Sequence, residues 1–221
     1  MEALGTPTLA MPLAGRRALI TGGSRGIGLA IAERFIDAGA EVVIVSRKQD
    51  QLDAVAAQLR TRGGKAHAIA AHVGKLDEIR ALVARLDNEG LTIDVLVNNA
   101  GISPPHVESM VDTTEALWDK VMDVNLKGPF FLTAEIGRRM AARGGGSVVN
   151  ISTTSALMAQ PEIAAYCISK AALNAMTRCF ARELGPQGVR VNAISCGVIK
   201  TAMGDHTLND PQRYADMMKI N

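Results

Sequence analysis

Tyr166 and Lys170 stand four positions apart in a segment that reads YCISK. On an α-helix, two residues at this spacing present their side chains on one face. A free tyrosine phenol has a pKa of about 10, which is too high for efficient proton transfer at neutral pH. A neighbouring lysine ammonium favours the phenolate and is expected to lower that pKa. The pair therefore predicts proton exchange with a substrate oxygen.

A second group with chemical potential is the glycine-rich turn TGGSRGIG over residues 21–28. The first glycine permits a tight turn, the second lets the backbone approach a pyrophosphate, and the third lets helix pack against strand. Free N–H groups at the start of such a helix bind phosphates. The turn predicts a dinucleotide site formed by Gly22, Ser24, Arg25, Gly26, Ile27 and Gly28.

The residues after the second predicted strand bear on the choice of dinucleotide. In dinucleotide-binding folds an acidic residue about 20 positions beyond the turn binds the ribose 2′-hydroxyl. This chain has Ser46, Arg47 and Lys48 there, and no acid. An arginine offers a 2′-phosphate a bidentate fork, and Arg25 in the turn can reach the same corner. We therefore predict NADP(H), with Ser46 and Arg47 among its contacts; the alternative is that Arg47 and Lys48 form a solvated loop.

The elements that must position these residues follow from the hydrophobic pattern. Strands are predicted over residues 17–21, 41–46, 65–71, 95–98, 147–151 and 189–195. Helices are predicted over residues 26–38, 49–62, 76–89, 117–143 (bent near Gly128 and Pro129) and 164–184. This alternation implies right-handed crossovers. The fold class is therefore α/β, a single Rossmann-type domain with a doubly wound parallel sheet and helices on both faces.

Composition favours the same class and argues against several others. Of 221 residues, 48% are hydrophobic but only 3% aromatic, which indicates an aliphatic core suited to a buried parallel sheet. The net charge of +2 is spread along the chain, so no nucleic-acid partner is indicated. No apolar run approaches the roughly 18 residues of a membrane span.

The cysteines and the N-terminus indicate the compartment. Cys167, Cys179 and Cys196 are odd in number and lack CxxC spacing, so reduced thiols in a cytoplasmic protein fit better than disulfides or a metal site. Residues 1–12 make a poor signal peptide. We expect them to form a flexible arm before a domain of residues 13–221.

Three motifs in this order resemble the short-chain dehydrogenase/reductase family: the glycine turn, NNAG at residues 98–101, and the Tyr166/Lys170 pair. The resemblance extends over about residues 13–203. It implies that Tyr166 donates a proton to the carbonyl oxygen during reduction and accepts it during oxidation. It also implies that Lys170 holds the nicotinamide ribose.

Two further catalytic positions are implied by the resemblance. The family's serine is matched by Thr153, whose hydroxyl would orient the carbonyl, with Ser152 and Ser155 as alternatives. The family's asparagine is matched by Asn125, which would anchor a water chain between Lys170 and solvent; the alternative is a polar core residue that bends the helix.

The remaining cofactor contacts are also implied by the resemblance. His72 stands where the family has an aspartate beside the adenine, and Cys196 replaces the usual proline before the last glycine. A reactive thiol at Cys196 is possible but less expected than an inert one. The implied contacts are His72, Val73, Asn98, Ala100, Gly101, Gly197, Ile199 and Thr201.

The implied activity is NADP(H)-dependent hydride transfer between the nicotinamide and a small carbonyl or secondary alcohol, as in carbonyl reductases, by a homodimer or homotetramer. One alternative is 3-oxoacyl-[acyl-carrier-protein] reduction, because those enzymes share these motifs; Arg138, Arg139 and Arg143 would then face an acidic carrier. The second alternative is a non-catalytic NADP(H)-binding protein. Family members usually continue beyond the point matching Asn221, so we expect the seventh strand to be missing.

Overall fold

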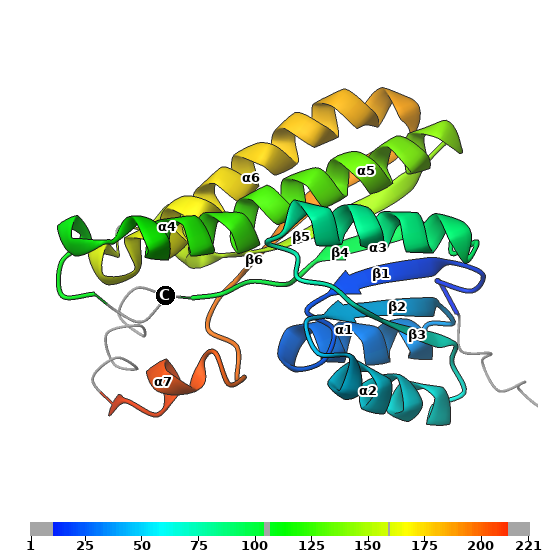
Figure 1. Cartoon of the computed structure of the whole chain (residues 1–221), viewed down its shortest axis with the longest axis horizontal. Helices are drawn as coiled ribbons and strands as arrows, with labels where there is room; N and C mark the ends of the chain where they lie inside the picture. The colour runs from blue at the N-terminus through cyan, green and yellow to red at the C-terminus, as the bar shows by residue number, and fades with distance from the viewer. Residues whose placement is uncertain (1–10, 104–106, 159, 212–221) are drawn as a thin grey trace, which may run out of the picture.

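A computed structural model describes residues 11–103, 107–158 and 160–211 of the chain (Figure 1). The expected flexible arm lies outside the described residues, apart from its last two positions. Six parallel strands form one sheet in the order β3-β2-β1-β4-β5-β6. The strands are β1 (Arg17–Thr21), β2 (Glu41–Ser46), β3 (Ala66–Ala70), β4 (Val95–Asn98), β5 (Gly146–Thr153) and β6 (Val189–Cys196).

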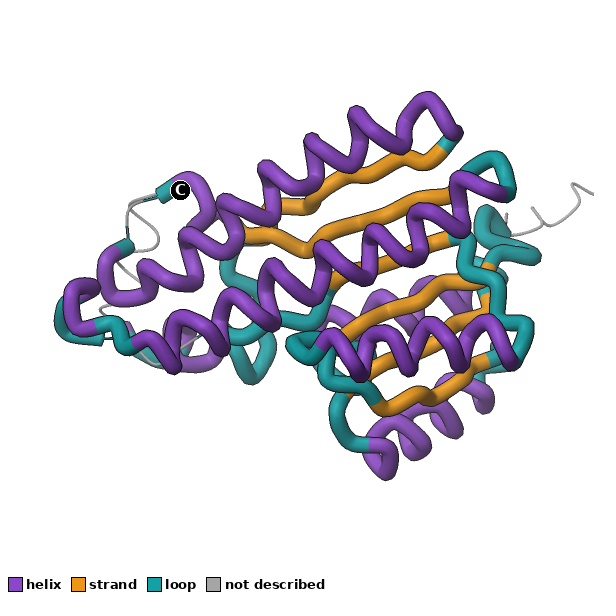
Figure 2. The backbone as a smooth tube through the Cα atoms, turned by 45° about the horizontal axis from the view of Figure 1, so that its top comes forward, coloured by secondary structure: helices purple, strands orange, loops and turns teal. Residues whose placement is uncertain are grey.

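Helices cover both faces of the sheet, as Figure 1 shows. One face carries α1 (Gly26–Asp37) and α2 (Gln49–Thr61). The other face carries α3 (Leu76–Asn88), α4 (Glu115–Met122), α5 (Gly128–Ala142) and α6 (Ala164–Leu184). In Figure 2 the long α5 and α6 run beside each other over β4, β5 and β6. A short α7 (Asp205–Leu208) follows β6, and no described helix is long and apolar enough to cross a membrane.

The central strands are apolar on both faces because helices bury both. Leu19 and Ile20 of β1 are fully buried, as are the β2 residues from Val42 to Val45. Their side chains alternate between the two hydrophobic clusters: Leu19 packs with the α3 side and Ile20 with the α1 side. Continuous apolar runs, rather than alternation, are what a parallel sheet covered on both sides requires. The predicted doubly wound α/β fold is confirmed.

The fourth predicted helix is interrupted rather than simply bent. A π-helical turn, η2 (Asp123–Lys127), separates α4 from α5. The interruption thus lies just before Gly128 and Pro129, where the bend was predicted. A π turn adds a residue to one helical turn and often occurs at a functional site. Here it carries Asn125.

The order of the strands places the site. All six strands are parallel, but the order in which the chain adds them reverses at β1 and β4, which are hydrogen-bonded neighbours: β2 and β3 lie beyond β1, and β5 and β6 lie beyond β4. In open α/β sheets, ligands bind at the carboxyl ends of the strands at such a switch point. β5 runs two residues further than predicted, so Thr153 pairs with Cys196 at that same end.

Candidate active site

The glycine turn after β1 depends on backbone conformations that only glycine adopts easily. Gly22 has φ +66° and Gly26 has φ +57°. A Cβ on Gly22 would lie 2.8 Å from Asn99 Nδ2, and one on Gly28 would collide with the Gly22 carbonyl oxygen. The three glycines therefore allow the tight turn and the close packing of α1 predicted from the sequence.

Asn99 and Thr21 hold this turn against β4, and the sequence reading did not single out either residue. Asn99 Nδ2 donates to the Thr21 and Gly22 carbonyl oxygens at 2.9 and 3.3 Å. In return, the Thr21 hydroxyl accepts the N–H groups of Asn99 and Ala100, both at 3.0 Å. The NNAG motif was the available signal, because one of its two asparagines clamps the turn.

The geometry above the turn suits a dinucleotide. A Cβ added to Gly26 would meet only Thr201, at 3.5 Å. The backbone at the start of α1 therefore has free space beside it and faces the loop after β6. Arg25 is exposed at the N-cap of α1, and Arg47 is exposed immediately after β2. Ser24 and Ile27 are half-buried in the turn, and Ser46 ends β2. These residues would hold the pyrophosphate and adenosine end of a nicotinamide dinucleotide.

Two predicted contacts use their side chains within the protein. Asn98 is buried, and its Nδ2 donates to Thr133 Oγ1 at 2.9 Å and to Asn150 Oδ1 at 2.8 Å. Its side chain thus faces the helix layer, so only its backbone is placed to line a cofactor groove. His72 Nδ1 accepts the Gly74 N–H at 3.0 Å, which shapes the loop after β3 where Val73 is also buried.

Three of the predicted catalytic side chains meet at the ends of β5 and α6. The Tyr166 phenol is hydrogen-bonded to the Thr153 side chain. Lys170 Nζ donates to the Ile151 carbonyl oxygen at 2.8 Å. Thr153 Oγ1 also accepts the Ser155 N–H at 3.2 Å, which fixes the side chain at the start of the following turn. Ser152, on the neighbouring β5 position, is buried like Thr153, but Thr153 is the hydroxyl that acts on Tyr166.

The pKa values differ from the expectation that Lys170 lowers that of Tyr166. Burial raises the pKa of Tyr166 above its usual 10.0, and the Thr153 hydrogen bond offsets only part of that rise. Burial also lowers the pKa of Lys170 from 10.5 to about 8. The expected lowering was wrong for this structure, because the lysine is itself desolvated and bonded to a backbone carbonyl.

Asn125 is completely buried, and both ends of its amide are bonded to the loop after β4. Asn125 Oδ1 accepts the Ile102 N–H at 2.8 Å, and Nδ2 donates to the Ile102 carbonyl at 2.9 Å. Gly101 lies against this contact, because a Cβ there would be 3.4 Å from both Asn125 Oδ1 and Lys170 Nζ. Asn125 therefore lies near Lys170, on the π turn that interrupts the helix, and its part in a water chain stays a prediction.

The loop after β6 completes the site. Cys196 is a half-buried free thiol opposite Thr153, close enough for its charge to act on both Tyr166 and Lys170. Gly197 and Ile199 are exposed, and the Thr201 hydroxyl lies 3.4 Å from the Ile199 carbonyl oxygen. Ile199 and Thr201 thus lie on the loop that faces the glycine turn.

Comparisons with known proteins agree with this geometry. The sequence model of the short chain dehydrogenase family matches residues 16–212. Human "Dehydrogenase/reductase SDR family member 4" is 39% identical over 206 residues, 93% of this chain and 74% of that protein. The "NAD-dependent glycerol dehydrogenase" of Listeria innocua is 41% identical over 187 residues, 85% of this chain and 72% of that protein. A gluconate 5-dehydrogenase from Burkholderia cenocepacia, solved with NADP and tartrate, is 32% identical with a TM-score of 0.87, covering 92% of this chain and 79% of that one.

Proposed function

The chain belongs to the short-chain dehydrogenase family, and from that premise we propose that it is an NADP(H)-dependent reductase of small ketones or aldehydes. Its family members are oxidoreductases that act on alcohols and carbonyls with nicotinamide cofactors, and this chain is one of them. The observation that carries the finer proposal is the hydrogen bond between Tyr166 and Thr153, with the buried Lys170 one helical turn along α6. It supports a proton donor and an orienting hydroxyl that act on one substrate oxygen.

The protonation state of Tyr166 suits the reductive half of the reaction. Because burial raises the pKa of Tyr166, the phenol is protonated at neutral pH and is ready to donate to a carbonyl oxygen. Thr153 orients the oxygen by a second hydrogen bond, and Lys170 lies one helical turn from Tyr166 on α6. The cofactor, when bound, supplies the hydride. These residues therefore hold the proton that reduction of a carbonyl requires.

The preference for NADP(H) rests on charge at the adenosine end. Arg25 and Arg47 are exposed on either side of the glycine turn, and neither is engaged in a described salt bridge. Both are therefore available to a 2′-phosphate. The Listeria relative is named as NAD-dependent, so this choice belongs to the chain's own residues rather than to its family.

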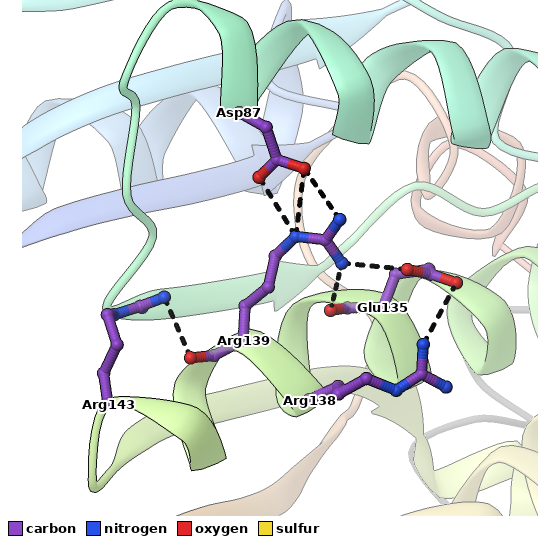
Figure 3. A network of polar contacts seen from close by, with 5 residues as sticks. All are labelled: Asp87, Glu135, Arg138, Arg139 and Arg143. Atoms are coloured by element: carbon purple, nitrogen blue, oxygen red, sulfur yellow. Dashed lines mark hydrogen bonds and ion pairs between the residues drawn. The ribbon is translucent and has the colours of Figure 1, made fainter.

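The contacts of Arg138, Arg139 and Arg143 do not favour a substrate carried on acyl-carrier protein. Arg139 is bound to Asp87 of α3 at 2.7 Å and to Glu135 at 2.8 Å (Figure 3). Arg143 donates to the Ile93 carbonyl at 2.6 Å. Arg138 and Arg143 are both exposed, and Arg138 lies 3.8 Å from Glu135. Since two of the three arginines tie α5 to its neighbours, they are poorly available to an acidic partner, and a free small molecule fits better.

A homodimer or homotetramer built on α5 and α6 is also part of this proposal. Large apolar side chains stay exposed on these helices and on α4, among them Trp118, Phe131 and Ile168. Ala171 and Ala175 of α6 are small, and Ala175 is exposed, so a second helix can approach closely. A twofold contact would bury these side chains. We propose a cytoplasmic location on the evidence of the reduced cysteines.

The test is oxidation of NADPH by the purified protein with a panel of small ketones and with a 3-oxoacyl thioester, free and on acyl-carrier protein. Turnover of the free ketones supports the proposal. Turnover of the carrier-bound substrate alone would favour a 3-oxoacyl-[acyl-carrier-protein] reductase. Binding of NADPH without any turnover would favour a non-catalytic protein.

A further inference from the structure

Ser169 lies between Tyr166 and Lys170 on α6 and is completely buried. We propose that it is a positioning residue for the catalytic turn, acting through Asn125. This inference rests on the proposed reductase function and assigns a role to a hydroxyl that the proton chemistry itself does not use.

The hydrogen bonds of Ser169 run in one direction. Its hydroxyl donates to the Tyr166 carbonyl oxygen at 2.7 Å, within the same helical turn. Since its proton is used there, the oxygen accepts Asn125 Nδ2, at 3.1 Å. Asn125 Nδ2 gives its other proton to the Ile102 carbonyl. Both N–H groups of the Asn125 amide therefore have acceptors: Ile102 holds one side of the amide, and Ser169 supplies the contact that ties it to α6.

This contact matters because the oxygen end of the same amide holds the loop beside Lys170. Asn125 Oδ1 accepts the Ile102 N–H at 2.8 Å, and a Cβ added to the adjacent Gly101 would lie 3.4 Å from both Oδ1 and Lys170 Nζ. Ser169 thus ties the helix of Tyr166 and Lys170, the π turn η2, and the loop after β4 to one another. The lysine ammonium is confined between that loop and the Ile151 carbonyl.

Removal of the hydroxyl leaves one N–H of a completely buried amide without its acceptor. Asn125 then keeps its two bonds to Ile102 but loses its bond to α6, so the π turn and the loop after β4 can shift relative to Tyr166 and Lys170. Small misplacement of catalytic groups costs rate more than it costs cofactor affinity, because the reaction is far more sensitive to geometry than binding is. Ser169 therefore acts on kcat and on the pH dependence of the reaction.

The same helix offers a matched control. Thr177 is also buried, donates to the Leu173 carbonyl at 2.7 Å and accepts an asparagine amide, that of Asn150, at 2.8 Å. It lies three turns from Tyr166 and contacts no proposed catalytic group. Ser169→Ala and Thr177→Val each delete one buried hydroxyl with little change of shape, so both should lower the melting temperature.

The experiment measures kcat, KM, the pH profile of kcat, NADPH affinity by fluorescence titration, and melting temperature for both variants and for Tyr166→Phe. We expect Ser169→Ala to lose about tenfold in kcat and to shift the midpoint of the pH profile, with the NADPH dissociation constant within about threefold of wild type. Thr177→Val should keep the wild-type kcat and profile.

If Ser169→Ala matches Thr177→Val in kcat and pH profile, the positioning role is wrong and the hydroxyl is only structural. If the alanine variant does not fold, Ser169→Cys replaces the hydroxyl by a thiol of similar shape, which is a much weaker hydrogen-bonding group, and is judged by the same criteria. A wild-type protein without turnover would overturn the reductase proposal and this one together. If the wild type is active and Tyr166→Phe abolishes that activity, the reductase proposal stands, and the comparison of Ser169→Ala with Thr177→Val alone tests the role of Ser169.

Discussion

Lys170 Nζ lies 2.8 Å from the Ile151 carbonyl oxygen, and the lysine is 5% exposed. The bond anchors the amine under β5, two residues before Thr153. Burial lowers the lysine pKa to about 8, so near neutral pH the protein keeps a charged group that its surroundings disfavour. A cost in folding stability is the physical consequence.

Lys170→Met should therefore stabilise the fold at pH 7 while abolishing activity. The folded-state pKa lies below the ordinary 10.5, so the unfolded state binds more protons between about pH 8 and 10.5, and wild-type stability rises with pH across that window. From pH 7 to 9.5 the wild type should gain about 2 kcal/mol relative to the variant. Urea unfolding of both proteins at the two pH values measures this difference.

Lys120→Met, at an exposed position of α4, is the control and should show no such dependence on pH. A stability difference between wild type and Lys170→Met that stays constant from pH 7 to 9.5 would mean that the lysine pKa is not lowered in the folded protein.

Cofactor choice should depend on Arg47. NADPH is expected to bind at least about tenfold more tightly than NADH, which corresponds to about 1.4 kcal/mol. Arg47→Asp should erase or reverse the preference, because a carboxylate repels the 2′-phosphate and suits a 2′-hydroxyl. Fluorescence titration of both cofactors measures it, with Arg80→Asp on the exposed face of α3 as the control. Equal affinity of the wild type for both cofactors would refute the assignment.

Thr153→Ala should lower kcat by about 10²-fold, because it removes a hydrogen bond felt mainly in the transition state. Thr153→Ser keeps the hydroxyl and should retain most activity. NADPH affinity should barely change in either variant. Steady-state kinetics with one good ketone decides: near-full activity of Thr153→Ala together with a collapse in Ser152→Ala or Ser155→Ala would show that another hydroxyl does this work.

The protein should form dimers or tetramers at micromolar concentration in light scattering. Ala175→Arg places a long charged side chain on the exposed face of α6 and should shift the population toward monomer. Ala84→Arg makes the same change on the exposed face of α3 and should not. A wild type that is monomeric at every micromolar concentration measured would refute a subunit contact through α5 and α6.

Local patterns were sufficient to predict the fold and the elements that carry the proposed site. The apolar runs at Arg17–Thr21 and Glu41–Ser46 and the glycine turn between them required no distant information, and the observed bounds of β1 and β2 equal the predicted ones. The placement of Tyr166 and Lys170 on one face of a helix also followed from their spacing, since one helical turn separates them.

Features that depend on contacts between distant segments could not be predicted in this way. The π turn η2 carries Asn125, whose side-chain amide bonds to Ile102, a partner that the local sequence does not reveal. The Asn98 side chain faces Thr133 and Asn150 because α5 and β5 bring those groups to it. The raised pKa of Tyr166 likewise reflects burial that only the folded chain creates.

The central claim is that Tyr166 donates the proton in an NADPH-dependent carbonyl reduction, and wild type against Tyr166→Phe at saturating NADPH tests it most directly. Phenylalanine keeps the ring and its packing but removes the hydroxyl that bonds to Thr153. We predict that the variant binds NADPH like the wild type while kcat falls by more than about 10²-fold, further than in Thr153→Ala. A Tyr166→Phe protein that reduces the same ketone at the wild-type rate would contradict the account.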